Sequence, residues 1–373
     1  MINIIRNHKL YYILALVVGM TVMFFGCEGP EGPAGEDGDD GATGPAGPAG
    51  IAGPAGPDML DDCKLCHNNT TNILAAKTQW AASVHATGGH SYYGSITSCA
   101  PCHTSQGFLE VVSTGDDATV AAIPDPAQPN CRTCHKIHDA YDVTDWALTT
   151  TAAVVPLFDE NASIDIGDGN LCANCHQARP AVIPAWDATV LDSTSLGRLG
   201  PHHGPQSNIL AGISGWEVKP TGFMAYDNSA HTSLDDGCIT CHMADAYGAY
   251  AGGHTMKIRY KRSSDAPADD PRFYDEGCET CHTTVDGEDK ADAFAIEVQA
   301  LLDALETDLV ALGALIWDTE DEEFTQVTGK FNDIVVGAVW NYVLVLEDKS
   351  MGAHNPKYVE ALLTNAKLAL DAL

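Results

Sequence analysis

Basic residues are scarce in this chain of 373 amino acids. Lysine and arginine together number 19, against 51 aspartates and glutamates, so the formal net charge is −32. A surface of this sign repels phosphate groups, which excludes nucleic acid and anionic membrane surfaces as partners held by charge attraction. A cationic partner is the kind that the composition favours.

Long apolar runs are also lacking, with one exception at the N-terminus. Residues 11–25 form an apolar run behind two basic residues, which is the layout of a secretory signal and is too short for a good membrane span. The run ends in Gly26 and Cys27, and a small residue followed by a lone cysteine resembles the lipobox of bacterial lipoproteins. The resemblance implies a signal peptide over residues 1–26 and lipidation of Cys27, although the two phenylalanines before Gly26 depart from the usual pattern.

This N-terminus predicts a location. We expect secretion across the inner membrane and a lipid anchor at the outer membrane or cell surface, on its periplasmic or extracellular face. Cleavage without acylation and an uncleaved anchor are the alternatives. No other segment of the sequence is long and apolar enough to span a bilayer.

A glycine falls at every third position from Gly29 to Gly56, and six of these ten glycines are followed by proline. Only glycine fits at the axis of a collagen triple helix, so strict periodicity is what such a trimer needs. The pattern predicts a collagen-like stalk over residues 27–57, as either a triple helix or a single-chain spacer. Either form would separate the anchor from the rest of the chain by up to ~90 Å, at about 3.1 Å per residue.

The twelve remaining cysteines form six CxxC pairs, and a histidine follows each pair directly. The motifs are Cys63/Cys66/His67, Cys99/Cys102/His103, Cys131/Cys134/His135, Cys172/Cys175/His176, Cys238/Cys241/His242 and Cys278/Cys281/His282. Chance would place six histidines in this way about once in 10⁸ chains, and zinc sites or disulfides would not need them. Positions i, i+3 and i+4 share one face of a helical turn, so two thiols can form thioethers to a haem while the imidazole reaches its iron. The motifs therefore predict six covalently attached haem c groups.

The motif spacing also indicates the fold class. Residues 58–282 number 225, about 37 per haem, so the porphyrins would supply much of the buried interior. Beyond them, apolar residues recur at helical spacing on either side of an acidic loop at residues 318–323, and Asn355 and Pro356 look like the N-cap and first position of a last helix. We expect a mainly α, haem-packed multihaem cytochrome c domain over 58–290 with little β structure, followed by long C-terminal helices over 291–373.

Histidine supplies more than enough candidates for the sixth ligand of each iron. Eight histidines lie outside both the motifs and the signal: His85, His90, His138, His202, His203, His231, His254 and His354. This excess favours bis-histidine ligation over methionine, because methionine ligation raises the reduction potential and few methionines remain after the signal.

Local spacing helps to choose among the eight. His138 follows His135 by three residues and projects from the same side of a helix, so it should bind a neighbouring haem. His202 and His203 are adjacent and cannot normally both ligate; we take His203 as the ligand. His90 follows a glycine pair and looks more like a loop histidine.

Several stretches resemble the superfamily of ammonia-forming cytochrome c nitrite reductase, hydroxylamine oxidoreductase and related octahaem proteins. They are residues 172–180 (CANCHQARP), 200–212 (GPHHGPQSNILAG), 229–258 and 340–366. The resemblance implies that His231, His254 and His354 are distal ligands, that His85 in WAASVH is another, and that the C-terminal helices resemble a dimerisation region.

The departures from that superfamily bear on function. Its nitrite reductases usually carry lysine in place of one motif histidine, whereas all six motifs here have histidine. We therefore expect an electron carrier that relays electrons through bis-histidine haems to redox partner proteins such as other cytochromes, with no nucleic acid partner and with scope for a homodimer or homotrimer. The alternative is a reductase of nitrite, hydroxylamine or a sulfur oxyanion at one open haem, for which Tyr247, Tyr250 and Arg259 are pocket candidates.

Overall fold

The computed structural model describes most of the chain after the predicted stalk, namely residues 67, 71–179, 201, 204–262, 271–283, 287–320, 322–327 and 330–373. All of them belong to one compact unit, Gly56–Leu373. The predicted signal, Cys27, the glycine repeat, Cys63, Cys66 and the His202/His203 pair lie outside the described residues. The domain limits at 57/58 and 290/291 remain predictions.

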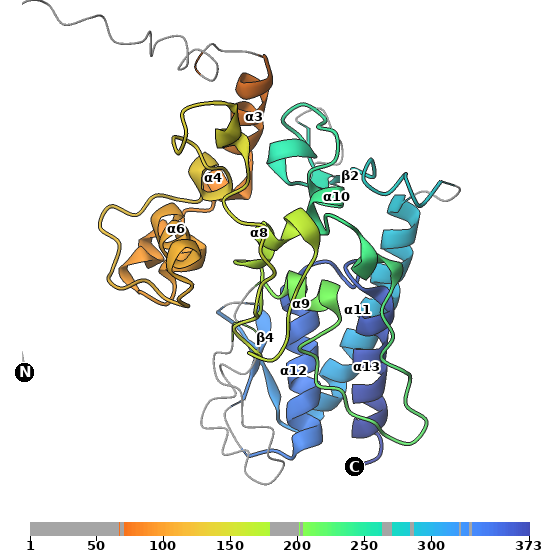
Figure 1. Cartoon of the computed structure of the whole chain (residues 1–373). Coiled ribbons are helices and arrows are strands. Elements are labelled where there is room, and N and C mark those ends of the chain that lie inside the picture. The colour runs from red at the N-terminus through yellow and green to blue at the C-terminus, as the bar shows by residue number, and fades with distance from the viewer. Residues whose placement is uncertain are drawn as a thin grey trace, which may run out of the picture. The chain divides into compact units, whose positions relative to one another are not determined.

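Short helices and turns make up the chain as far as residue 283 (Figure 1). The α-helices are α3 (Thr71–Ala81), α4 (Val84–Thr87), α5 (Ala100–His103), α6 (Ser105–Thr114), α7 (Cys131–Cys134), α8 (Asn170–Ala173), α9 (Gln206–Ala211) and α10 (Cys238–His242). Short 3₁₀ helices lie between them, η2 (Ser91–Ser95), η3 (Val143–Trp146), η4 (Gly167–Gly169) and η6 (Ala230–Ser233), and one more follows α10, η7 (Gly253–Thr255).

Strands are few in the part of the chain that the structure describes. An antiparallel pair joins β1 (Arg259–Tyr260) to β2 (Arg272–Phe273), and a second pair joins β3 (Leu315–Asp318) to β4 (Glu323–Gln326). The second pair flanks the predicted acidic loop, and Asp318 is paired with Glu323 at its closed end. The expectation of a mainly helical chain with little β structure is thus confirmed.

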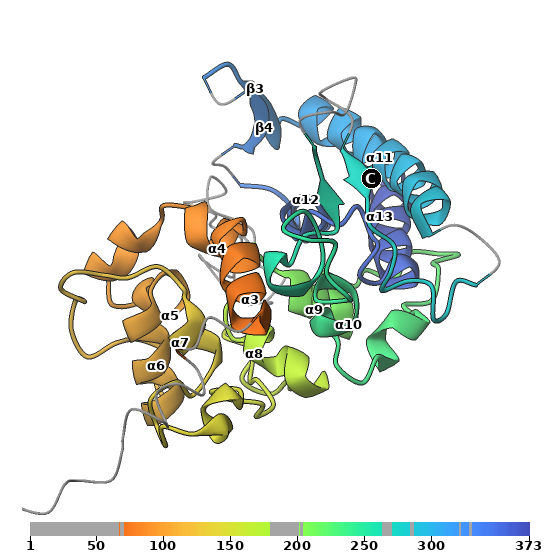
Figure 2. The ribbon, with the colours of Figure 1, turned by 90° about the horizontal axis from the view of Figure 1, so that it is seen from above.

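Three long helices follow: α11 (Gly287–Ala311), α12 (Asp333–Asp348) and α13 (Pro356–Leu370). They lie side by side in both views (Figures 1 and 2). Their apolar faces form the main buried core, in which Leu305, Val339 and Leu362 are all inaccessible to solvent. Ile209 of α9 belongs to the same core, so the helices are fastened to the motif-bearing part of the chain. No helix within the described ranges has both the length and the apolar character to cross a membrane.

Two buried asparagines bind an irregular segment to these helices through its backbone. Asn341 of α12 accepts a hydrogen bond from the Trp216 amide (2.7 Å) and donates one to the Trp216 carbonyl (3.0 Å). Asn365 of α13 makes the same two bonds with Met224, at 2.7 and 2.8 Å. Because both asparagines are fully buried, their amides need these partners. The segment around residues 214–229 therefore follows the surface of α12 and α13.

Asn355 occupies the predicted N-cap position of the last helix, but its side chain has another role than capping. It directly precedes α13, whose first residue is Pro356, but its side chain makes no capping hydrogen bond. The buried amide instead accepts from the Ser229 N–H (2.9 Å) and donates to the Ile209 carbonyl (3.2 Å) and to Asn228 (2.8 Å). Tertiary partners thus outcompete the local cap for this side chain.

Candidate haem sites

Each described CxxCH motif closes one helical turn. The histidine N–H of four motifs donates to the carbonyl of the first cysteine, at 2.8 to 3.2 Å, in residues 99–103, 131–135, 172–176 and 278–282, and the motif at 238–242 is the helix α10. The ten described motif cysteines are free thiols. Both cysteines and the histidine can therefore face one ligand, as thioether attachment of haem requires.

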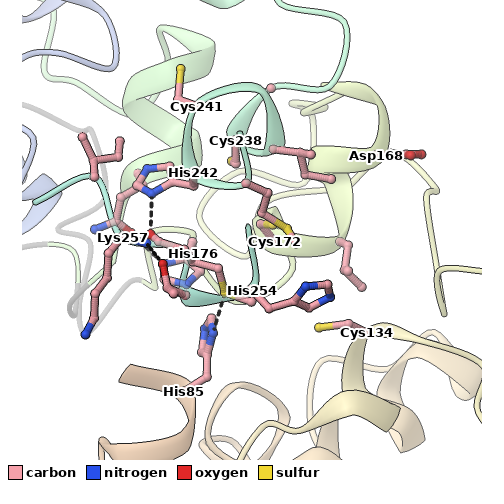
Figure 3. Close-up of a pocket in the computed structure, with 18 of the residues that line it drawn as sticks. His85, Cys134, Asp168, Cys172, His176, Cys238, Cys241, His242, His254 and Lys257 are labelled. Carbon is pink, nitrogen blue, oxygen red and sulfur yellow. Dashed lines mark hydrogen bonds between the residues drawn. The ribbon is translucent and has the colours of Figure 1, made fainter. Parts of the chain in front are cut away.

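The structure brings each of the six motif histidines beside a histidine from outside the motifs. The pairs, with ring-centre distances, are His67 and His138 (6.3 Å), His103 and His90 (6.2 Å), His135 and His254 (6.1 Å), His176 and His85 (6.1 Å), His242 and His354 (6.3 Å), and His282 and His231 (6.1 Å). Figure 3 shows the His85 and His176 pair together with one member of each of two other pairs, His242 and His254.

The constancy of this distance needs a cause. Aromatic rings in direct contact have centres about 4.5–7 Å apart, so any one pair could be ordinary packing. Packing alone does not explain why all six distances fall between 6.1 and 6.3 Å while the angles between the ring planes range from 26° to 83°. Metal–nitrogen bonds of about 2.0 Å on opposite sides of one iron would place the nitrogens about 4 Å apart and the ring centres about 6 Å apart. The pairs fit bis-histidine ligation of a haem iron.

His90 is the residue that the sequence reasoning missed. It precedes η2, close to the motif that it faces, and its ring centre also lies 6.3 Å from that of Tyr93. The predicted ligand His203 lies outside the described residues, and every motif histidine has a partner without it. A short connection from His90 to Cys99 was the available signal, since a chain of nine residues keeps both near one site.

His138 lies beside a neighbouring motif as predicted, but the predicted reason is wrong: α7 ends at Cys134, so His138 is in a turn and shares no helix face with His135. It follows the motif at 131–135 in the sequence but pairs with His67 of the first motif. Its backbone is left-handed, with φ of +71°, and its N–H donates to the Asp145 carboxylate at 2.7 Å. Asp145 thereby directs the ring away from its own motif, and the two motifs become neighbours.

Hydrogen bonds at Nδ1 orient several of the rings. The Nδ1–H groups of His135, His242 and His231 donate to the carbonyls of Trp146 (2.7 Å), Met256 (2.9 Å) and Ala353 (2.7 Å), respectively. A carbonyl can only accept, so Nδ1 carries the proton and the Nε2 lone pair is free for a metal.

Burial keeps other rings neutral, as metal ligation requires. Burial, assisted by the nearby His176, lowers the pKa of His85 to about 4. Burial also lowers the pKa of His242 to about 4 and lowers the pKa of His176. These imidazoles therefore carry no charge at neutral pH.

A cavity of about 2870 Å³ connects the sites. It is bordered by cysteines or histidines of all five described motifs, by His67, and by five of the six partner histidines. Figure 3 shows part of it, with His85, His176, His242 and His254 around one space. Its volume is roughly three times the upper end for an ordinary ligand pocket, about 1,000 Å³. Several large groups side by side fit this space better than one small ligand.

The motifs also contact one another. The Cys175 thiol donates to the carbonyl of Pro101 in the second motif at 3.8 Å, and Cys238 of the fifth motif packs against the apolar cluster that contains Ala173 of the fourth. The fourth motif therefore lies close to the second and the fifth. A Cβ at Gly277, directly before the sixth motif, would lie 2.7 Å from Cα of Cys241, so the sixth motif lies beside the fifth.

The candidate pocket residues for a reductase pack among themselves. The ring centres of Tyr247 and Tyr250 lie 5.8 Å apart, within a cluster that includes Tyr260. Arg259 forms an ion pair with Asp292 and lies 5.0 Å above the Phe273 ring. Their described partners are thus other side chains of this cluster and its neighbours.

Comparisons with known proteins give only distant likeness. No protein-family model and no curated protein matches the chain. Among solved structures, the outer cell wall cytochrome OcwA is similar with a TM-score of 0.48 and 20% identity, over 78% of this chain and 49% of that one. The undecahaem cytochrome from the S-layer of Carboxydothermus ferrireducens has a TM-score of 0.42 and 19% identity, over 74% of this chain and 38% of that one. This chain thus spans half or less of the length of either structure.

Proposed function

We propose that this chain is an extracytoplasmic hexahaem c-type cytochrome that relays electrons between redox proteins. The observation that carries the proposal is the pairing of every motif histidine with one histidine from elsewhere, at a nearly constant ring-centre distance. Such a pair would hold a haem iron from both sides and leave no position open to a substrate. An electron carrier needs only this arrangement.

The cysteines and histidines would have different roles at each haem. Motif cysteines would hold each haem by thioethers, the motif histidine would be the first axial ligand, and the second ligands would be His138, His90, His254, His85, His354 and His231, in order of the motifs. When bound, each haem would supply one reversible iron couple, ferric to ferrous. His90 takes the place that the sequence favoured for His203.

Contacts between motifs support a relay rather than six isolated sites. The fourth motif contacts the second through Cys175 and Pro101 and packs near Cys238 of the fifth, and the first and third are joined by the His67 and His138 pair. Met256 joins two further sites, since its sulfur lies 3.0 Å from Nδ1 of His85 and its carbonyl accepts from His242. The chain thereby holds neighbouring centres in fixed positions.

The proposal includes an anchored location. The signal over residues 1–26, a lipid on Cys27 and the glycine repeat over 27–57 would tether the haem-bearing part to the outer membrane or cell surface. The partners would be other cytochromes or redox proteins. The strongly acidic composition favours partners with a basic docking face.

Electron paramagnetic resonance of the purified ferric protein tests the ligation. We expect six haems per chain by mass, all low-spin at neutral pH, because two imidazoles give a strong ligand field. A high-spin signal integrating to about one haem in six would contradict the carrier and favour the reductase. Fewer than six covalent haems would contradict the attachment sites themselves.

A further inference from the structure

Asp348, the last residue of α12, is a buried carboxylate beside one of these pairs. Its side chain is inaccessible to solvent, and Oδ1 accepts a hydrogen bond from Nδ1 of His354 at 2.6 Å. Ser350 donates its hydroxyl to Oδ2. Among the described residues, no lysine or arginine lies within ion-pair distance of it.

Burying a carboxylate without a full opposite charge is unfavourable. The His354 imidazole and the Ser350 hydroxyl offer hydrogen bonds, and positive charge on the His354 side of the carboxylate would balance it. An iron held between the rings of His354 and His242 would supply such a charge.

This site differs from others in the charge of the acceptor. The Nδ1 groups of His135 and His231 meet backbone carbonyls, and that of His176 meets the amide oxygen of Gln206 (3.1 Å). A carboxylate draws the Nδ1 proton more strongly, which makes the imidazole a better electron donor to a metal. Its negative charge, on a side chain inaccessible to solvent, also favours the more positive ferric state.

We propose that Asp348 holds the reduction potential of the His242–His354 centre below those of the centres whose histidines donate to neutral acceptors. This inference rests on the proposed function. The fifth motif lies close to both of its sequence neighbours: a Cβ at Gly169, shortly before the fourth motif, would lie 3.1 Å from the Cys238 nitrogen, and a Cβ at Gly277, directly before the sixth, would lie 2.7 Å from Cα of Cys241. A low-potential centre there puts an uphill step between the sixth haem and the others, and Asp348 is the positioning residue that sets it.

Potentiometric titration of the full holoprotein, followed optically and by paramagnetic resonance, tests the inference. In Asp348→Asn the amide oxygen still accepts from His354, but the charge is gone. We expect the reduction equilibrium constant of one centre to rise at least tenfold, an upward shift of about 59 mV for one electron, with the other five unchanged. The His354→Ala variant identifies the centre, because that low-spin signal is lost. Asp371→Asn, which removes an exposed charge at the end of α13, is the matched control and should shift nothing.

Ser350→Ala provides a change of opposite sign. Without the hydroxyl, the carboxylate is a stronger acceptor for His354, so the potential of the same centre should fall. If Asp348→Asn makes that centre high-spin, its reduction potential no longer reports on the charge alone. The direction in which Ser350→Ala shifts the potential of the centre then tests the role of Asp348. Six low-spin haems with unchanged potentials in both variants would overturn the role of Asp348 and leave the carrier intact, whereas a wild-type protein without six low-spin haems would overturn the carrier.

Discussion

The residues next to His90 in the sequence do not reveal which side chain its ring faces in the structure. It lies between two glycines and a tyrosine pair, a context typical of a loop, yet its ring faces His103 at 6.2 Å. Gly89, with φ of +68°, reverses the chain just before it, a conformation that glycine adopts without strain. The loop context is therefore what turns the ring toward the second motif.

Replacement of His90 by alanine tests this pairing against the one that the sequence favoured. We expect His90→Ala to convert one haem in six to a high-spin form, because His103 would lose the ligand opposite to it. The covalent haem count should stay at six, since attachment depends on the cysteines. His203→Ala is the matched control and should leave all six haems low-spin. The reverse result, with a high-spin haem in the His203 variant alone, would restore the original choice.

For single residues, the sequence predicted those features that depend only on neighbouring residues along the chain. A CxxCH motif spans five residues, so its geometry is set within one helical turn. His138 was expected beside a neighbouring motif and lies there, but in a turn and not on the helix that the spacing argument assumed. The partners of the other motifs depend on how distant segments pack, as with His254 beside His135. Spacing alone offers no rule for such pairs, so it could not indicate that His90 lies beside His103.

Gly337 in helix α12 is required by a contact with another segment, the one that contains Trp216. A Cβ on Gly337 would come within 2.7 Å of two atoms of the Trp216 ring. The ring lies against this bare stretch of helix because Asn341, one turn later, binds the Trp216 backbone. Gly337 thus allows the close approach of the segment that α12 holds.

Two effects of opposite sign act on Gly337→Ala. Alanine gains about 1 kcal/mol of helix propensity, whereas forcing a methyl group into a packed site costs about 1–3 kcal/mol. We expect the clash with Trp216 to dominate, so that the free energy of unfolding falls by about 1 kcal/mol in denaturant titrations. In a Trp216→Ala background the same substitution should be neutral or stabilising, and an equal loss in both backgrounds would exclude the clash.

The long helices were predictable because their apolar stripes repeat over several turns. The hairpin β3–β4 was not, since each strand has only four residues and its cross-strand contact, Trp317 against Phe324 at 5.0 Å, becomes visible only once the strands pair. The N-cap position of Asn355 was predictable, but the partners of its buried amide were not, for a related reason. Its partners come from residues 209–229, far away in the sequence.

For the whole molecule, the proposed anchor predicts where the protein is found. Cys27→Ala removes the thiol that a lipid would modify and leaves the signal and the haem motifs unchanged. We expect haem-bearing protein to move from the membrane fraction to the soluble fraction, as measured by haem absorbance after fractionation. Cys281→Ala, which alters a cysteine within a motif, should stay with the membrane. An unchanged distribution of the Cys27 variant would contradict lipidation.

The histidine pairs also imply an order in which the proposed haem sites would form during export. A chain exported N-terminus first presents His90 before His103, so that pair can close as soon as the second motif emerges. His242 has to wait for His354, which directly precedes the last helix. The pair at His242 would therefore close only when export is nearly complete. A chain cut short before residue 354 would leave His242 facing water, so the final helices finish a site that begins more than a hundred residues earlier.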